Sequence, residues 1–188
     1  IGLSPDQLRN NTYLGILSSQ FNSTTCTNET KAYSLLDQKA SNAAEDGMPR
    51  MNFTLADAII LGAAENGVAV RGHVLTWDAY MTEWFFHEGY DEKQPVASKE
   101  VILARMESYI TQVITHFETE CPGVIYCWDV VHEAMGDHPG EYEAGDPCHI
   151  RTVRSGAPNA FYAYIGPEYV PYSFLYARNA AEALGADI

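Results

Sequence analysis

Short apolar segments of strand length alternate with longer amphipathic segments along the chain, and this alternation restricts the fold more than any other feature. Residues 68–70 and the start of 124–131 are apolar at successive positions. Residues 53–66 and 98–118 instead repeat apolar side chains at helical spacing. Strands that are apolar on both faces need helices to cover them, as in parallel sheets. The pattern therefore predicts an α/β fold built on a parallel sheet.

Capping residues mark where several of the expected helices begin and end. Ser98 is a good N-cap for the longest helix, while Gly67 and Gly185 are good C-terminal stops. The expected elements are a helix over 6–11, strands over 13–18 and 21–25, a helix over 53–66, a strand over 68–70, a helix over 98–118, a strand over 124–131 and a helix over 168–184. The loop over 136–167 is too long for a simple connection, and loops of that length are usually functional or disordered.

These elements make about four strand–helix units, followed by residues 186–188, which look like the beginning of a fifth strand. An open sheet of four strands with apolar edges invites aggregation. The chain is therefore either a small doubly wound domain or part of a structure that closes on itself.

The chain is acidic, with a formal net charge of −14 and an isoelectric point near 4.6. Such a surface repels nucleic acid and anionic membranes, so we expect neither as a partner. It suits a neutral substrate such as a polysaccharide. No apolar run reaches the roughly 18 residues that a membrane span needs. The chain begins at Ile1 without a visible signal peptide, as expected of a mature or trimmed N-terminus.

Four cysteines are present, and their even number permits two disulfides without requiring them. The chain has no Cys-x-x-Cys pair, which argues against a zinc or redox motif. We therefore expect structural or free thiols at these positions: Cys26, Cys121, Cys127 and Cys148.

Polar clusters follow three of the expected strands, at 27–31, at 71–78 and at 128–133. In parallel α/β folds, active sites form at the carboxyl ends of strands. Glu133 ends a strand whose body is apolar, and a carboxyl group there loses part of its hydration. This favours the protonated form that a general acid needs. Asp129 lies inside the same strand, and we interpret it as a structural partner.

Three ordered segments resemble signatures of the family-ten glycoside hydrolases, which are mostly endo-1,4-β-xylanases. Residues 20–31 resemble the signature of the second strand, Arg71 to Trp77 that of the third, and Pro122 to Ala134 that of the fourth. The resemblance implies an α/β fold of the (β/α)8 TIM barrel type. It also implies that residues 1–188 are the N-terminal half of one catalytic barrel and supply its first four β/α units.

By this resemblance, Glu133 is the general acid/base of a retaining enzyme that cleaves internal β-1,4 bonds of xylan. Asn28, Lys31, His73 and Trp77 match residues that hold the sugars just upstream of the scissile bond. The nucleophile is a glutamate about 5 Å from the acid/base. It lies on the seventh strand, so a complementary C-terminal half is an expected partner. The resemblance implies a secreted, extracellular protein with xylan or xylo-oligosaccharides as ligands, and no cofactor or metal.

The sequence departs from the family pattern mainly within the three signatures or in the few residues that follow them. Thr27, Asp78, Tyr80 and His132 stand where the family usually has Glu, His, Gln and Asn, and Ala32 and Ala163 also differ. We therefore keep two alternatives. The first is a repurposed cleft in which Asp78 and Glu133 act as general bases on a small aromatic ligand. The second is a non-catalytic ligand binder. A metal site made of His73, Asp78 and His132 is a variant of the first.

Overall fold

Four strands form one parallel sheet whose order follows the chain. The computed structural model describes all 188 residues. The strands are β1 (Gly2–Leu3), β2 (Ser23–Cys26), β3 (Ala69–Thr76) and β4 (Ile125–Val131), in the order β1-β2-β3-β4. A doubly wound sheet changes direction near its first strand, whereas the strands of a barrel are added one after another. The order therefore selects part of a barrel over a small doubly wound domain.

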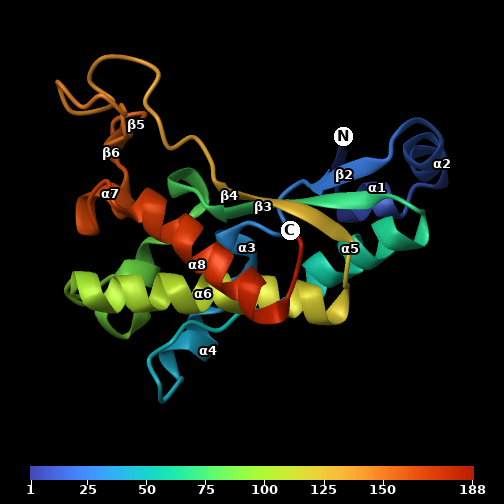
Figure 1. Cartoon of the computed structure of the whole chain (residues 1–188). Helices are drawn as coiled ribbons and strands as arrows, with labels where there is room; N and C mark the ends of the chain where they lie inside the picture. Colours follow the sequence, from blue (N-terminus) through green and yellow to red (C-terminus); the bar gives the residue numbers. More distant parts are fainter.

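The helices and short 3-10 turns fill the connections between these strands. They are α1 (Pro5–Leu8), α2 (Asn11–Gln20), α3 (Ala32–Leu35), α4 (Gln38–Asn42), α5 (Thr54–Glu65), η1 (Asp78–Tyr80), η2 (Glu83–Phe86), η3 (Glu88–Tyr90), α6 (Lys99–Glu120), α7 (Ala160–Tyr164) and α8 (Tyr169–Leu184). A small antiparallel hairpin, β5 (Val153–Arg154) and β6 (Ala157–Pro158), stands apart from the main sheet, beyond the end of β4 (Figure 1).

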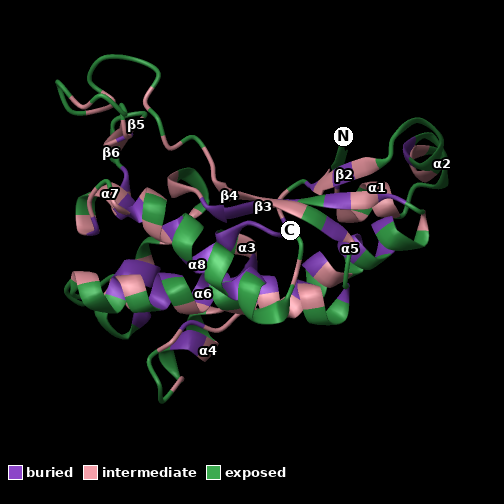
Figure 2. Ribbon diagram, in the orientation of Figure 1, coloured by how far each residue is buried: buried purple, intermediate pink, exposed green.

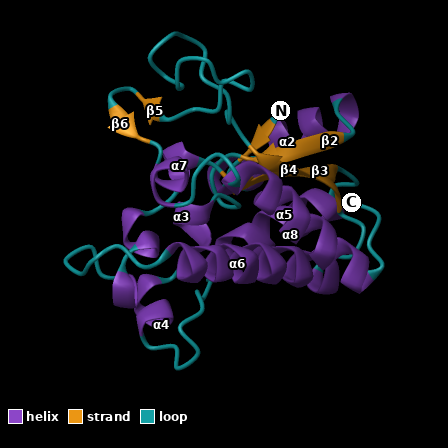
Figure 3. Ribbon diagram, turned by 60° about the vertical axis from the view of Figure 1, so that its left-hand side comes forward, coloured by secondary structure: helices purple, strands orange, loops and turns teal.

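Helices α5, α6 and α8 lie on the same side of the sheet, as Figures 1 and 3 both show. The side chains that α6 turns inward are fully buried: Ile102, Met106, Tyr109, Ile110, Val113, Ile114 and Phe117. Burying a large apolar side chain contributes about 1.5–3 kcal/mol, so this one stripe is a major source of stability. Figure 2 shows the same division, with buried residues on the inward faces of the helices and exposed residues on the outward faces.

The predicted ends of the long helices are confirmed. The Ser98 side chain accepts a hydrogen bond from the backbone N–H of Val101 and so caps α6. Gly185 ends α8 with a φ of 65°, a left-handed conformation that glycine adopts without strain. The helix predicted over 53–66 is α5, and the strand predicted over 124–131 is β4.

The prediction of a strand over 13–18 is wrong, because these residues lie in α2. The side chain of Asn10 accepts hydrogen bonds from the backbone N–H groups of Thr12 and Tyr13 and so starts a helix there. The first strand is instead Gly2–Leu3, which pairs with β2. Residues 186–188 form no strand, and Ile188 packs against the core.

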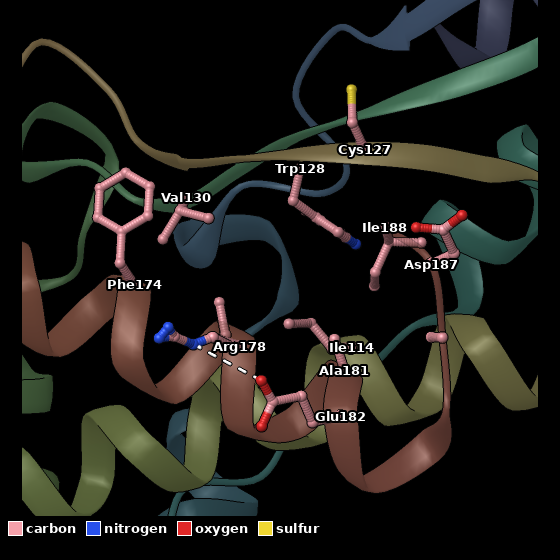
Figure 4. Close-up of a pocket in the computed structure, with 12 residues that line it drawn as sticks. Ile114, Cys127, Trp128, Val130, Phe174, Arg178, Ala181, Glu182, Asp187 and Ile188 are labelled. Carbon is pink, nitrogen blue, oxygen red and sulfur yellow. Dashed lines mark ion pairs between the residues drawn. The ribbon is translucent and has the colours of Figure 1, made fainter.

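A tryptophan between β4 and the helices shows which face of the sheet carries the polar groups. Trp128 and Val130 point from β4 toward α8, whereas Cys127 points the opposite way (Figure 4). Successive strand residues alternate between faces, so Asp129 lies on the same face as Cys127, away from the helices. The ring of Trp128 lies directly over Gly72 of β3, where a Cβ atom would come within 2.4 Å of it.

The four cysteines are free thiols, in agreement with the prediction. Cys26 and Cys121 are buried, and burial raises the pKa of Cys26 to about 12, so that thiol is inert. None of the helices combines the length and the hydropathy that crossing a lipid bilayer requires.

Candidate active site

The carboxyl ends of β2, β3 and β4 meet at one rim of the sheet, and the predicted site residues gather there. Each contacts at least one other member of the group or a charged residue that joins them. The structure thus brings together all eight predicted side chains: Asn28, Lys31, His73, Trp77, Asp78, Tyr80, His132 and Glu133.

Lys31 and Asn28 follow β2, and Lys31 lies against two aromatic rings that follow β3. The Lys31 side chain is nearly buried and donates a hydrogen bond to the Asn28 Oδ1 atom at 3.0 Å. Its ammonium group lies 4.0 Å from the ring centre of Tyr80 and 5.1 Å from that of Trp77. Burial lowers the pKa of Lys31, although the charge of Glu29 opposes this effect. Polar donors beside aromatic faces are suited to binding a sugar ring.

Asp129 holds two basic side chains of β3 in place. One of its oxygens accepts a hydrogen bond from Arg71, and the other lies 2.9 Å from the Nδ1 atom of His73. Burial acts to raise the pKa of Asp129, but the hydrogen bonds from Arg71 and His73 outweigh it and leave that pKa below its usual value. Because a carboxylate only accepts, the Nδ1 atom of His73 is the donor in this hydrogen bond.

The rings of His73, Trp77 and His132 lie close together beside Glu133. The ring centres of Trp77 and His132 are 4.5 Å apart, those of His73 and His132 4.8 Å, and those of His73 and Trp77 5.7 Å. Burial, and then the neighbouring His73, lower the pKa of His132 below its ordinary value of 6.5. The His132 imidazole is therefore neutral at pH 7 and contributes a polar but uncharged edge.

Glu133 projects from the end of β4 into this cluster, and its side chain is 42% exposed. Its Oε2 atom accepts hydrogen bonds from the Trp77 Nε1 atom at 3.0 Å and from Arg154 at 2.6 Å. The Oε1 atom lies 3.9 Å from the Nε2 atom of His132, which is beyond hydrogen-bond distance. The backbone of Glu133 has a φ of 51°, a conformation that is costly outside glycine and common at functional sites.

Arg151 maintains this unusual backbone from the loop that follows. Its side chain is 4% exposed and donates hydrogen bonds to the carbonyl oxygens of Glu133, at 3.1 Å, and of Met135, at 2.7 Å. It also pairs with Glu141 and Asp137. The loop is thus tied down at the residue that carries the candidate acid/base.

Arg154, in β5, is the site residue that the sequence analysis missed. Its guanidinium donates two hydrogen bonds to Asp78, each 2.8 Å long, and a third to the Glu133 carboxylate. The long segment 136–167 was predicted to be functional or disordered, but nothing in its sequence indicates which of its residues contacts the polar cluster. The sequence shows only that the segment contains two arginines, Arg151 and Arg154, and not which of them contacts Glu133.

The alternative metal site is not supported by this arrangement. Both oxygens of Asp78 accept from Arg154, and no three His, Cys, Asp or Glu side chains lie in an arrangement that would hold a metal ion.

The strand order, the helices on one side of the sheet and the polar cluster at its carboxyl rim define part of a (β/α)8 barrel whose candidate site lies at the usual position. The family model described as glycosyl hydrolase family 10 matches residues 2–185, and the chain belongs to that family.

Among its relatives, a putative endo-1,4-beta-xylanase of Caldicellulosiruptor saccharolyticus is 38% identical over 79% of this chain and 43% of its own length. Endo-1,4-beta-xylanase A of Thermotoga maritima is 34% identical over 88% of this chain and 13% of its own length. The structure of a Clostridium thermocellum xylanase complexed with xylohexaose superposes with a TM-score of 0.81 and 26% identity, over 95% of this chain and 34% of that one.

The chain spans less than half the length of these relatives. A psychrophilic family-10 endo-beta-1,4-xylanase, with a TM-score of 0.75 and 27% identity, covers 97% of this chain, which corresponds to 48% of that structure. The chain therefore contains part of the barrel, and the sheet seen here is its first four strands.

Proposed function

We propose that this chain supplies the acid/base half of a retaining endo-1,4-β-xylanase, with Glu133 as the general acid/base. The observation that carries the proposal is the position of the Glu133 carboxylate at the end of β4. One of its oxygens is held by Trp77 and Arg154, and the other is free of donors. Structures of relatives with bound xylohexaose and xylotriose support xylan as the substrate class.

In the proposed first step, Glu133 gives its proton to the glycosidic oxygen as the bond from that oxygen to the anomeric carbon breaks. A second carboxylate forms a bond to the same carbon. In the next step Glu133 takes a proton from water, the water oxygen bonds to the anomeric carbon, and the second carboxylate is released. Asn28, Lys31, His73 and Trp77 hold the upstream sugars through hydrogen bonds and stacking.

The second carboxylate must come from outside these residues. A retaining mechanism needs two carboxyl groups about 5 Å apart. Asp78 is the other acid among the eight side chains, but it is only 6% exposed and both of its oxygens accept from Arg154. The neighbouring Asp129 is likewise engaged, by Arg71 and His73. We infer that a complementary C-terminal half provides the nucleophile.

The free side of β4 offers a place for that half. β4 is the last strand of the sheet, and an apolar groove of about 460 Å³ runs between it and α8 (Figure 4). Trp128, Val130 and Phe174 line this groove together with Ile188. In a (β/α)8 barrel the next strand–helix unit packs at this position. Because xylan is a polymer, we also propose that the protein acts outside the cell.

Xylan hydrolysis tests the proposal. Reducing-sugar release is measured with the chain alone and with a separately produced C-terminal half of a family-10 barrel. We expect the chain alone to bind xylo-oligosaccharides without turnover, and the combination to hydrolyse xylan. Glu133→Gln should lower turnover by about 10²–10⁴-fold, the usual contribution of a general acid. Glu107→Gln, on the exposed face of α6, is the matched control.

The outcomes separate the alternatives. Unchanged turnover in Glu133→Gln would remove Glu133 from the mechanism. Oligosaccharide binding without turnover, even in the completed barrel, would favour a non-catalytic binder. The engagement of both Asp78 oxygens by Arg154 argues against Asp78 as a free general base in a repurposed cleft.

A further inference from the structure

We propose that Arg154 is the positioning residue for the Glu133 carboxylate, that Asp78 anchors Arg154, and that this arrangement leaves Oε1 as the oxygen that carries the catalytic proton. The inference rests on the proposed role of Glu133 and extends it to a residue of the 136–167 loop and to one atom of the carboxyl group.

The anchor is a two-pronged ion pair. The Nε and Nη2 atoms of Arg154 each donate to a different oxygen of Asp78 at 2.8 Å. Paired hydrogen bonds of this kind fix both the distance and the plane of the guanidinium. The hydrogen bond to Asp78, followed by the charges of Asp78 and Glu133, raises the pKa of Arg154 despite partial burial. Arg154 is therefore charged at every pH at which the protein is folded.

The remaining part of the guanidinium faces Glu133. The Nη1 atom of Arg154 donates to Oε2 of Glu133 at 2.6 Å, and its Nη2 atom lies 3.4 Å from the Glu133 carbonyl oxygen. The guanidinium of Arg154 thus makes four donor contacts to Asp78 and Glu133. It therefore has no pair of free N–H donors with which to bind an anion. This makes Arg154 a brace between η1 and the end of β4 rather than a ligand-binding cation.

The two carboxylate oxygens of Glu133 differ in the hydrogen bonds that they accept. Oε2 accepts from both Arg154 and the Trp77 indole, so its lone pairs are engaged and a proton there would lose those bonds. Oε1 accepts no hydrogen bond, and the nearby Nε2 atom of His132 is 3.9 Å away. Protonated Glu133 therefore carries its hydrogen on Oε1, the oxygen that can approach the glycosidic oxygen of a substrate.

The backbone that presents Arg154 is well defined. Arg154 is the last residue of β5 and pairs with Ala157 of β6 across a turn containing Ser155 and Gly156, both with positive φ. Three residues earlier, the buried Arg151 ties the same loop to the Glu133 carbonyl oxygen. Two arginines of one loop thus hold Glu133, one through its backbone and one through its carboxylate.

The Trp77 indole provides a spectroscopic test that needs no turnover. The chain contains three tryptophans, so a ¹⁵N-labelled sample gives three indole N–H resonances, and Trp77→Phe identifies the one from Trp77. That N–H donates to the same oxygen as Arg154, so it reports on the carboxylate. In Arg154→Met we expect the Trp77 resonance to move while those of Trp84 and Trp128 stay in place, which also shows that the variant is folded.

Matched variants separate positioning from a general structural effect. Arg154→Lys keeps the positive charge but lacks the planar guanidinium with its paired donors. The chemical shift of the Trp77 indole in this variant should therefore lie between those of Arg154→Met and the wild type. Arg154→Met in the Glu133→Gln background should cause a much smaller displacement, because the carboxylate that links the two groups is gone. Arg178→Met on α8 should leave the resonance unchanged.

An unmoved Trp77 resonance in Arg154→Met would overturn the proposal, as would an equal displacement in the Glu133→Gln background. Where the completed barrel turns over xylan, Arg154→Met should lower kcat by about tenfold or more and leave KM nearly unchanged, because Arg154 acts through Glu133 and does not hold sugar. Failure of the proposed hydrolysis would leave the resonance test intact, so the two conclusions can fail separately.

Discussion

Replacing Arg151 with methionine should destabilise the protein by about 3 kcal/mol, because the buried guanidinium holds the loop that follows β4. The substitution leaves the Glu133 and Met135 carbonyl oxygens without their donors, at about 1 kcal/mol each. The pair with Glu141, which is 27% exposed, adds about 1 kcal/mol after screening. The pair with Asp137 is 77% exposed and adds almost nothing.

Urea unfolding followed by tryptophan fluorescence measures this loss as a lower midpoint with an unchanged slope. Methionine keeps most of the apolar stem, so lost packing contributes little. The control is Arg178→Met, whose pair with Glu182 is 3.7 Å long and largely exposed, and which should change stability by less than about 0.5 kcal/mol. A loss of under about 1 kcal/mol in Arg151→Met would refute the idea that this arginine holds the loop.

Two further predictions follow from the sheet. Gly72→Ala should lower the free energy of unfolding, measured by heat or urea, by about 1–3 kcal/mol, because its Cβ would come within 2.4 Å of the Trp128 ring. The contrasting variant Gly15→Ala, in α2 with open space around it, should raise the free energy of unfolding by about 0.5–1 kcal/mol. The lowered pKa of Asp129 means that its contribution to stability is complete above the ordinary value of 3.8 and is lost as the pH falls through the lower folded-state value. The stability difference between wild type and Asp129→Asn should therefore shrink as the pH falls below 3.8, and a difference that stays constant down to pH 2 would contradict this.

Local sequence signals predicted the long elements well and the short ones poorly. The α6 helix has seven buried apolar positions at helical spacing and a serine cap, and these signals agree with each other. Residues 13–18 carry the apolar run of a strand, but the Asn10 cap and the position of Leu17 in the core make them a helix. The two-residue β1 is too short for any periodic signal and exists only because β2 pairs with it.

The candidate site shows the same division. Glu133, Trp77 and their neighbours could be predicted because motifs at successive strand ends must meet at one rim of a parallel sheet. Their contacts could not, since Trp77 and Glu133 are 56 residues apart and Arg154 and Asp78 are 76 residues apart. One alternative made Asp78 a general base in a repurposed cleft, whereas in the structure both of its oxygens accept hydrogen bonds from Arg154.

The sequence by itself determined the strand–helix alternation, the family and the list of side chains that gather at the rim, because periodicity, caps and motifs are local properties of the chain. The tertiary structure alone decided which residues form the short first strand and which partner each charged group has. Those depend on which segments pack side by side, and a loop such as 136–167 carries no periodic signal for that. The position of Arg154 against Glu133 is therefore a product of the fold.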